Sequence, residues 1–122
     1  MDKRPVVLVV DDEPHIVNLI KLTLQQDYDI EVANSGNEAL HKAVSLKPDL
    51  ITMDIMMPGM SGFEVVRELK KYADTKKIPV LFLSAKGKLK DMYAGLDIGA
   101  DDYLTKPFEP EDLLERVKKI LE

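Results

Sequence analysis

Residues 49–62 read Asp-Leu-Ile-Thr-Met-Asp-Ile-Met-Met-Pro-Gly-Met-Ser-Gly, a short apolar run that stops at an acid. Leu50, Ile51 and Met53 are typical of a strand buried on both faces, and Asp54 stands at the carboxyl end of that strand. Open α/β sheets bind ligands in crevices outside the carboxyl ends of their strands. Asp54 is therefore a candidate for chemistry, although a lone aspartate in this position more often only caps the next turn.

Strands and helices are expected to alternate along the rest of the chain. Strands are expected at 6–10, 28–32, 49–54, 79–83 and 103–105, and helices at 14–26, 36–47, 63–72, 89–97 and from 110 onward. This alternation with short turns predicts a flavodoxin-like (βα)5 doubly wound sandwich with one parallel sheet. The second strand alternates apolar and acidic residues like an edge strand, which suits the strand order 2-1-3-4-5.

Composition limits the class of protein. A chain of 122 residues is long enough for one domain with a core, so residues 1–122 are expected to form a single domain. The net charge of −5 argues against direct nucleic acid binding. No apolar run approaches the roughly 20 residues that span a bilayer, and no signal peptide is evident, so we expect a cytoplasmic protein without membrane contact.

Polar or charged side chains follow four of the expected strands at one edge of the sheet. They are Asp11 and Asp12, Asp54, Ser84 and Lys106. Three carboxylates held together repel one another unless a cation offsets their charge, and a hard ion with oxygen ligands such as Mg²⁺, or Mn²⁺ in its place, suits them. A carboxylate beside a metal ion, with an ammonium and a hydroxyl opposite, is an arrangement for phosphoryl transfer to the carboxylate.

The sequence resembles the receiver domain of bacterial two-component response regulators over essentially its whole length. The resemblance rests on Asp11-Asp12, on Asp54 in Asp-Ile-Met-Met-Pro-Gly-Met-Ser-Gly, on Ser84-Ala85 and on Lys106-Pro107-Phe108. It implies that Asp54 accepts a phosphoryl group. It also implies a metal site made of Asp54, Asp12 as a direct ligand, Asp11 through a water molecule, and the backbone carbonyl of Met56.

Three further residues take roles from the same resemblance. Lys106 is expected to pair with a phosphoryl oxygen, with a cis bond to Pro107. Ser84 is expected to hydrogen-bond to the phosphoryl group, and Tyr103 matches the switch aromatic that turns inward as the Ser84 loop moves.

The resemblance implies a signalling switch in a phosphorelay. A sensor histidine kinase, a phosphotransfer protein or a small phosphodonor would supply the phosphoryl group, and the face from the fourth strand to the fifth helix would then shift to control a protein target or an output domain. A homodimer formed on phosphorylation is also compatible with the resemblance. Such a domain catalyses its own phosphorylation and dephosphorylation but is mainly a signalling protein, so its status as an enzyme stays open.

Three alternatives share this fold. A flavodoxin-like redox carrier needs a phosphate loop after the first strand, where Asp11-Asp12-Glu13 would repel phosphate. A magnesium phosphohydrolase with an Asp nucleophile usually has a second acid two positions later, which is Met56 here. A degenerate receiver that serves only for binding or dimerisation is the strongest alternative, and the intact Asp12, Asp54 and Lys106 argue against it.

Overall fold

The computed structural model describes residues 4–85 and 99–122. The strands are β1 (Val6–Val10), β2 (Asp29–Ala33), β3 (Leu50–Asp54), β4 (Val80–Ala85) and β5 (Asp102–Lys106). The helices within the described residues are α1 (Pro14–Leu24), α2 (Gly36–Leu46), α3 (Gly62–Leu69) and α5 (Pro110–Leu121). The helix expected at 89–97 lies outside the described residues.

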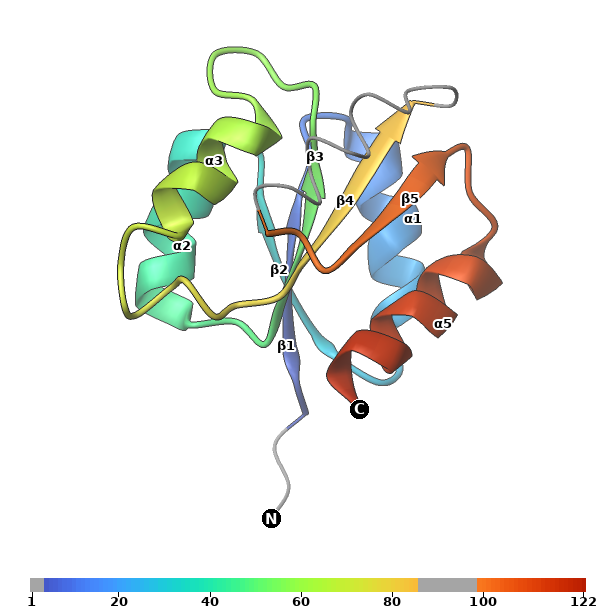
Figure 1. The fold of residues 1–122 in the computed structure, drawn as a ribbon. Helices are drawn as coiled ribbons and strands as arrows, with labels where there is room; N and C mark the ends of the chain where they lie inside the picture. The colour runs from blue at the N-terminus through green and yellow to red at the C-terminus, as the bar shows by residue number, and fades with distance from the viewer. Residues whose placement is uncertain (1–3, 86–98) are drawn as a thin grey trace.

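The strands form one parallel sheet with the order β2-β1-β3-β4-β5, which confirms the predicted topology. The central strand β3 is buried along its whole length, while β2 alternates exposed and half-buried residues as an edge strand does. Figure 1 shows α2 and α3 on one face of the sheet and α1 and α5 on the other. Each face therefore has its own hydrophobic core.

The two cores use alternate residues of the same strands. Leu8 and Met53 point into the core beneath α2 and α3, whereas Val9 and Leu50 point into the core beneath α1 and α5. A slip of one residue in any central strand would exchange these two sets. The hydrophobic pattern thus sets the register of the strands, and the register sets how far each strand extends toward the carboxyl edge of the sheet.

The helix α3 ends earlier than the apolar stripe to Tyr72 predicted. The backbone N–H of Lys70 closes the last turn by bonding to the carbonyl of Val66, and the buried hydroxyl of Thr75 donates to the Leu69 carbonyl at 2.6 Å. The side chain of Tyr72 is 58% exposed and does not belong to the buried stripe. A side-chain hydrogen bond from a later residue therefore satisfies the helix end and stops the helix.

The start of α3 packs directly against the end of β3. Ser61 and Glu64 form a capping box, and the N–H of Gly62 donates to the carbonyl of Ile55 at 2.9 Å. A Cβ atom on Gly62 would lie 2.4 Å from the carbonyl oxygen of Asp54. Only glycine allows the helix to start this close to the strand.

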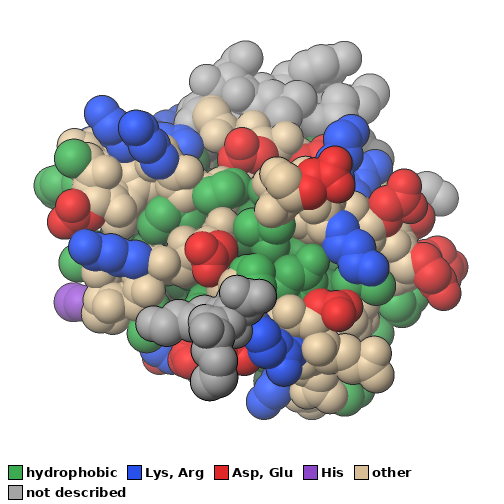
Figure 2. Space-filling model, turned by 90° about the horizontal axis from the view of Figure 1, so that it is seen from below, with side chains coloured by type: hydrophobic (Ala, Val, Ile, Leu, Met, Phe, Trp, Pro, Cys, Tyr) green, Lys and Arg blue, Asp and Glu red, His purple; other side chains and the backbone are tan. Residues whose placement is uncertain are grey.

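The edge at which the strands begin has a mixed surface. In the view of Figure 2, apolar side chains lie near the centre of this face, and acidic and basic side chains surround them.

None of the helices in the described part of the chain has the length and apolar character that a membrane crossing requires.

We expect Gly62→Ala to lower the free energy of unfolding by about 2–3 kcal/mol, because the new methyl group meets backbone atoms that cannot move aside. Urea unfolding followed by circular dichroism measures this loss. Gly59→Ala is the matched control, because its new methyl group would enter open space. The backbone at Gly59 has φ 81°, so only the strain of this left-handed conformation should lower the free energy of unfolding, by about 1 kcal/mol. Equal losses in both variants would contradict the close contact at Gly62.

Candidate functional site

The sheet brings the ends of β1, β3, β4 and β5 to one edge. In the register of the sheet, Asp54 pairs with Leu83 and Ala85 pairs with Lys106. Asp11 follows β1 directly, and its N–H donates to the carbonyl of Ala33 at 3.2 Å. Parallel strands of matched length therefore deliver these side chains to the same place.

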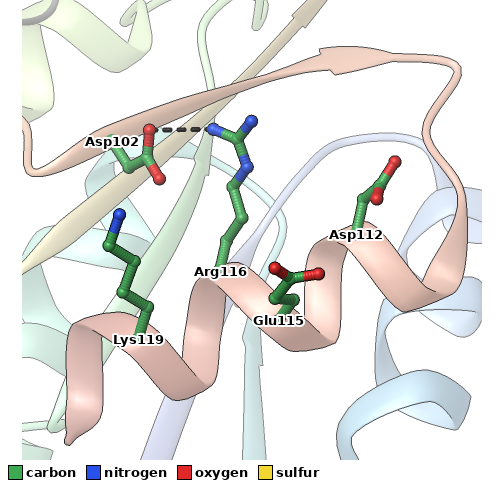
Figure 3. A pocket seen from close by; sticks show the side chains of 5 residues that line it. All are labelled: Asp102, Asp112, Glu115, Arg116 and Lys119. Carbon is green, nitrogen blue, oxygen red and sulfur yellow. Dashed lines mark hydrogen bonds and ion pairs between the residues drawn. The ribbon is translucent and has the colours of Figure 1, made fainter.

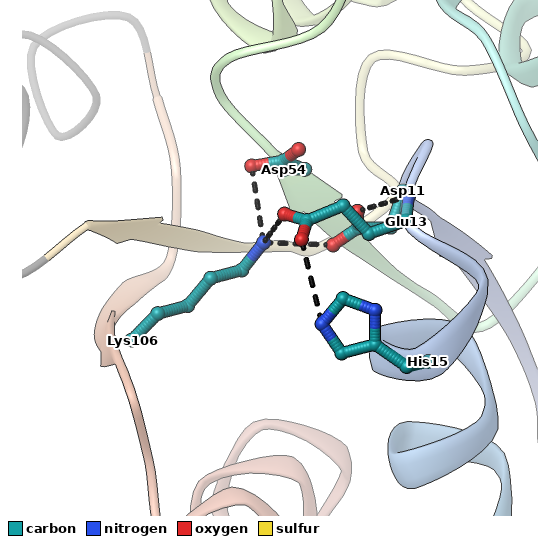
Figure 4. Close-up of polar contacts among 5 residues, drawn as sticks. All are labelled: Asp11, Glu13, His15, Asp54 and Lys106. Carbon is teal, nitrogen blue, oxygen red and sulfur yellow. Dashed lines mark hydrogen bonds and ion pairs between the residues drawn. The ribbon is translucent and has the colours of Figure 1, made fainter.

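The ammonium group of Lys106 is the centre of the site (Figure 4). Its Nζ donates to Oδ2 of Asp11 at 2.9 Å and lies 3.3 Å from Oδ1 of Asp54 and 3.8 Å from Oε1 of Glu13. The side chain of Lys106 is only 15% exposed. The side chains of Asp11, Asp54 and Lys106 therefore converge at one place, as the strand ends predicted.

Burial makes Asp54 an unusual carboxyl group. Its pKa is raised from 3.8 to about 6, chiefly because burial disfavours the charged form and also because the charge of Asp11 lies close by. The ammonium of Lys106 acts in the opposite direction and offsets part of the rise. Asp54 is thus ionised at neutral pH but is more basic than an ordinary aspartate.

Lys106 responds to the same neighbours. Burial alone would lower the pKa of its ammonium, but the hydrogen bond to Asp11 and the charges of Asp11 and Asp54 outweigh burial and leave the pKa above its ordinary value. The lysine stays charged over the physiological range.

Four acidic residues could hold a metal ion together. One carboxylate oxygen from each of Asp11, Asp12, Glu13 and Asp54 lies within 4.8 Å of the others. The donor set consists of carboxylates alone, which hard divalent cations prefer. Four carboxylates gather beside one ammonium, that of Lys106, in the described part of the chain, so these residues fit such a cation.

Glu13 is the member of this cluster that the sequence prediction missed. The run Asp11-Asp12-Glu13 was noted, but only its first two acids were assigned to the site. Its position just before Pro14, the first residue of α1, was the available signal, because a side chain at a helix start points back toward the end of the preceding strand.

The side chain of Met56, two residues after Asp54, is 72% exposed and takes no part in the core.

Ser84 and Tyr103 lie on the two strands next to Asp54. Ser84 is buried within β4, opposite Thr105 of β5, rather than in the loop that follows the strand. Tyr103 is already largely buried in the core beneath α2 and α3.

The peptide bond between Lys106 and Pro107 is cis, as expected.

A second polar pocket lies beside β5, away from the acidic cluster (Figure 3). Its lining residues come from β5 and α5 and are Asp102, Asp112, Glu115, Arg116 and Lys119. Arg116 donates to Asp102 at 2.9 Å and to the backbone carbonyl of Tyr103 at 2.7 Å. This arginine ties α5 to β5, which carries both Tyr103 and Lys106.

The parallel sheet and the acidic cluster at its carboxyl edge place the chain among doubly wound α/β proteins with a strand-end acidic site. Comparison with known proteins identifies the family. The sequence model of the response regulator receiver domain matches residues 7–118. The chain belongs to this family. Its function is phosphorylation-based signalling in two-component systems.

Curated relatives are transcriptional regulators. The chain is 47% identical over 122 residues to the alkaline phosphatase synthesis transcriptional regulatory protein PhoP of Bacillus subtilis. It is 44% identical over 118 residues to the DNA-binding dual master transcriptional regulator RpaA of Synechocystis. The matches cover 99% and 96% of this chain but 49% of each relative, so the chain spans about half the length of these proteins.

Solved structures agree with the fold over its full length. A response regulator from Chloroflexus aurantiacus, described as putative, superposes with a TM-score of 0.94 at 38% identity and covers 98% of both chains. The chemotaxis response regulator CheY4 of Vibrio cholerae gives a TM-score of 0.91 at 37% identity, with coverage of 98% of this chain and 100% of that one.

The expectation that the protein has no direct contact with nucleic acid is wrong. It is overturned by the relatives, of which RpaA is named as DNA-binding and PhoP as a transcriptional regulatory protein. The net charge of −5 describes 122 residues, about half the length of these relatives. An acidic charge on one module places no limit on another module of the same polypeptide.

We expect Asp54→Asn to raise the thermal stability of the metal-free domain at neutral pH. The pKa of Asp54 in the folded domain is about 6 and lies above 3.8, so ionisation costs folding free energy as pH rises through this interval. The cost is absent below about pH 4 and complete above about pH 7, where the shift corresponds to at most about 3 kcal/mol.

Thermal melts of Asp54→Asn and wild type between pH 4 and pH 8 measure this difference. The exposed Asp74→Asn serves as a control, because it removes a carboxylate without removing a buried charge. An Asp54→Asn variant that is less stable than wild type at pH 7.5 would contradict the origin given for the raised pKa.

Proposed function

We propose that this receiver domain accepts a phosphoryl group on Asp54 and thereby switches a downstream response. The single observation that supports the proposal most is the contact of one buried ammonium with two buried carboxylates, Lys106 with Asp11 and Asp54. A surface lysine or a strand-end aspartate alone would be unremarkable. Together they form a pocket with a nucleophile and a fixed positive charge.

Asp54 supplies the nucleophile. One of its oxygens attacks phosphorus in line, the bond from phosphorus to the histidine nitrogen or acyl oxygen of the donor breaks, and the leaving group takes the electron pair. An aspartyl phosphate forms on Asp54. The raised pKa of Asp54 favours this step, because the carboxylate is ionised at neutral pH yet more basic than usual.

Lys106 supplies the fixed positive charge. Its Nζ lies 3.3 Å from Oδ1 of Asp54, so it is within reach of an oxygen on a phosphoryl group bound there. Asp11 holds the ammonium at 2.9 Å on its other side. The lysine is therefore positioned before the donor arrives, and this pre-organisation lowers the barrier to transfer.

Asp11, Asp12 and Asp54, with the backbone carbonyl of Met56, would hold Mg²⁺, and Mn²⁺ could take its place. Such an ion supplies charge neutralisation for the phosphoryl oxygens. The carboxylate donor set and its spacing support this assignment.

Ser84 and Tyr103 would transmit the new charge. A phosphoryl group on Asp54 offers acceptor oxygens to the hydroxyl of Ser84 on the neighbouring strand β4. Tyr103 lies on β5, which Arg116 ties to α5. A shift of these strand ends would bias two arrangements of the surface from β4 to α5, and a partner that prefers one of them would read the signal.

A sensor histidine kinase or a phosphotransfer protein in the cytoplasm is the donor we propose. Gene transcription is the response we propose, because RpaA and PhoP are named as transcriptional regulators and the chain matches about half of each. A homodimer formed on phosphorylation is compatible with this scheme.

Incubation with acetyl phosphate and Mg²⁺ tests the site. Intact mass spectrometry should show one added phosphoryl group on the wild-type protein and none on Asp54→Asn, because the amide cannot form the acyl phosphate. Lys106→Ala should slow the gain by about a hundredfold or more, since the fixed positive charge is lost. A wild-type protein that gains no mass would overturn the proposal in favour of a degenerate receiver.

Mg²⁺ alone should raise the melting temperature, because it binds the folded pocket and not the unfolded chain. At ten times its Kd the ion adds about 1.4 kcal/mol, a shift of a few degrees. Asp12→Asn should reduce the shift, and KCl of equal ionic strength is the control for screening. No shift in wild type at 20 mM Mg²⁺ would count against the metal assignment.

A further inference from the structure

We infer that Glu13 is a specificity-determining residue that restrains phosphorylation by small anionic donors. The inference rests on the proposed function of Asp54. Glu13 places a fourth carboxylate beside the ammonium of Lys106, on a side chain that is 49% exposed. Its negative charge disfavours the entry of a free, highly charged phosphodonor.

The burial of the acids separates their roles. The side chains of Asp11 and Asp54 are 0% and 6% exposed, whereas that of Glu13 is 49% exposed. Asp11 and Asp54 also lie closer to the ammonium of Lys106, at 2.9 and 3.3 Å, than Glu13 does at 3.8 Å. Glu13 is thus, with Asp12, one of the two exposed acids of the group, and its carboxylate lies 3.8 Å from the Lys106 ammonium.

Contacts on both sides hold the Glu13 carboxylate near the pocket. Oε1 faces the ammonium of Lys106, and Oε2 lies 3.5 Å from Nε2 of His15 on the first turn of α1 (Figure 4). The charge of Glu13 therefore lies beside Lys106 in this structure.

The charge balance gives Glu13 its effect. The cluster holds four carboxylates, and Lys106 is the ammonium that contacts them among the described residues. Asp11, Asp12 and Asp54 belong to the proposed metal site, where an ion would offset their charge. Glu13 belongs to the same acidic cluster but is not one of the ligands proposed for Mg²⁺. Its charge acts on the arriving donor at short range, where the screening by salt is incomplete.

The chemical step itself does not involve Glu13. With acetyl phosphate, an Asp54 oxygen forms the new bond to phosphorus, and the bond from phosphorus to the acyl oxygen breaks with its electron pair going to acetate. Glu13 affects only how readily the donor reaches this position. Its removal should therefore change KM more than kcat.

The test compares Glu13→Gln with wild type by intact mass over time, at several donor concentrations and at a Mg²⁺ concentration shown by thermal shift to saturate each protein. For acetyl phosphate we expect kcat/KM to rise about threefold to tenfold in Glu13→Gln, with most of the change in KM. Phosphoramidate, which carries less negative charge, should show a smaller rise. Added KCl should reduce the difference between the two proteins.

Two variants serve as controls. Glu13→Asp keeps the charge and should stay within about twofold of wild type. Glu122→Gln removes an exposed carboxylate at the end of α5, at the opposite edge of the sheet, and should leave the rate unchanged.

The outcomes separate this inference from the function on which it rests. A Glu13→Gln rate equal to or below that of wild type, in a protein that does become phosphorylated, overturns the role of Glu13 alone. A change confined to kcat also overturns it, because that would indicate a structural effect. A wild-type protein that takes up no phosphoryl group overturns both.

Discussion

The ammonium of Lys106 is the group on which the carboxyl edge of the sheet depends. It contacts two buried carboxylates, Asp11 and Asp54, which would otherwise face each other without compensation. These residues come from β1, β3 and β5, so a single positive charge links strands that are far apart in sequence. Four carboxylates gather at this edge, and Lys106 is the ammonium that contacts them among the described residues. The site is left with negative charge that favours a further cation.

The geometry of the site follows from packing elsewhere. Two hydrophobic cores, one on each face, fix the register of β1, β3 and β4, and this register sets how far Asp11 and Asp54 project. The absence of a side chain at Gly62 lets α3 start directly behind the Asp54 carbonyl. Arg116 then joins β5 to α5 through Asp102. The positions of a few charged atoms are thus determined by apolar contacts over the whole domain.

Most of the fold could be predicted from the sequence, because buried parallel strands read as unbroken apolar runs such as Val6–Val10. The end of α3 could not be predicted from the apolar stripe, because it depends on a hydrogen bond from the Thr75 hydroxyl to the Leu69 carbonyl, six residues earlier. The strand ends predict Asp11, Asp54 and Lys106, whereas Glu13 stands between β1 and α1, and the sequence alone does not show that its side chain reaches Lys106. The charge of the chain misled the prediction about nucleic acid, since it reflects only about half the length of the relatives.

The hydrogen bond between Lys106 and Asp11 joins residues 95 positions apart in the chain. A nascent polypeptide that has emerged only through β4 carries both acids but lacks the positive charge that accompanies them. Its sheet would also lack the edge strand β5 and the helix that covers it. The contacts among Asp11, Asp54 and Lys106 can therefore form only after residue 106 has left the ribosome.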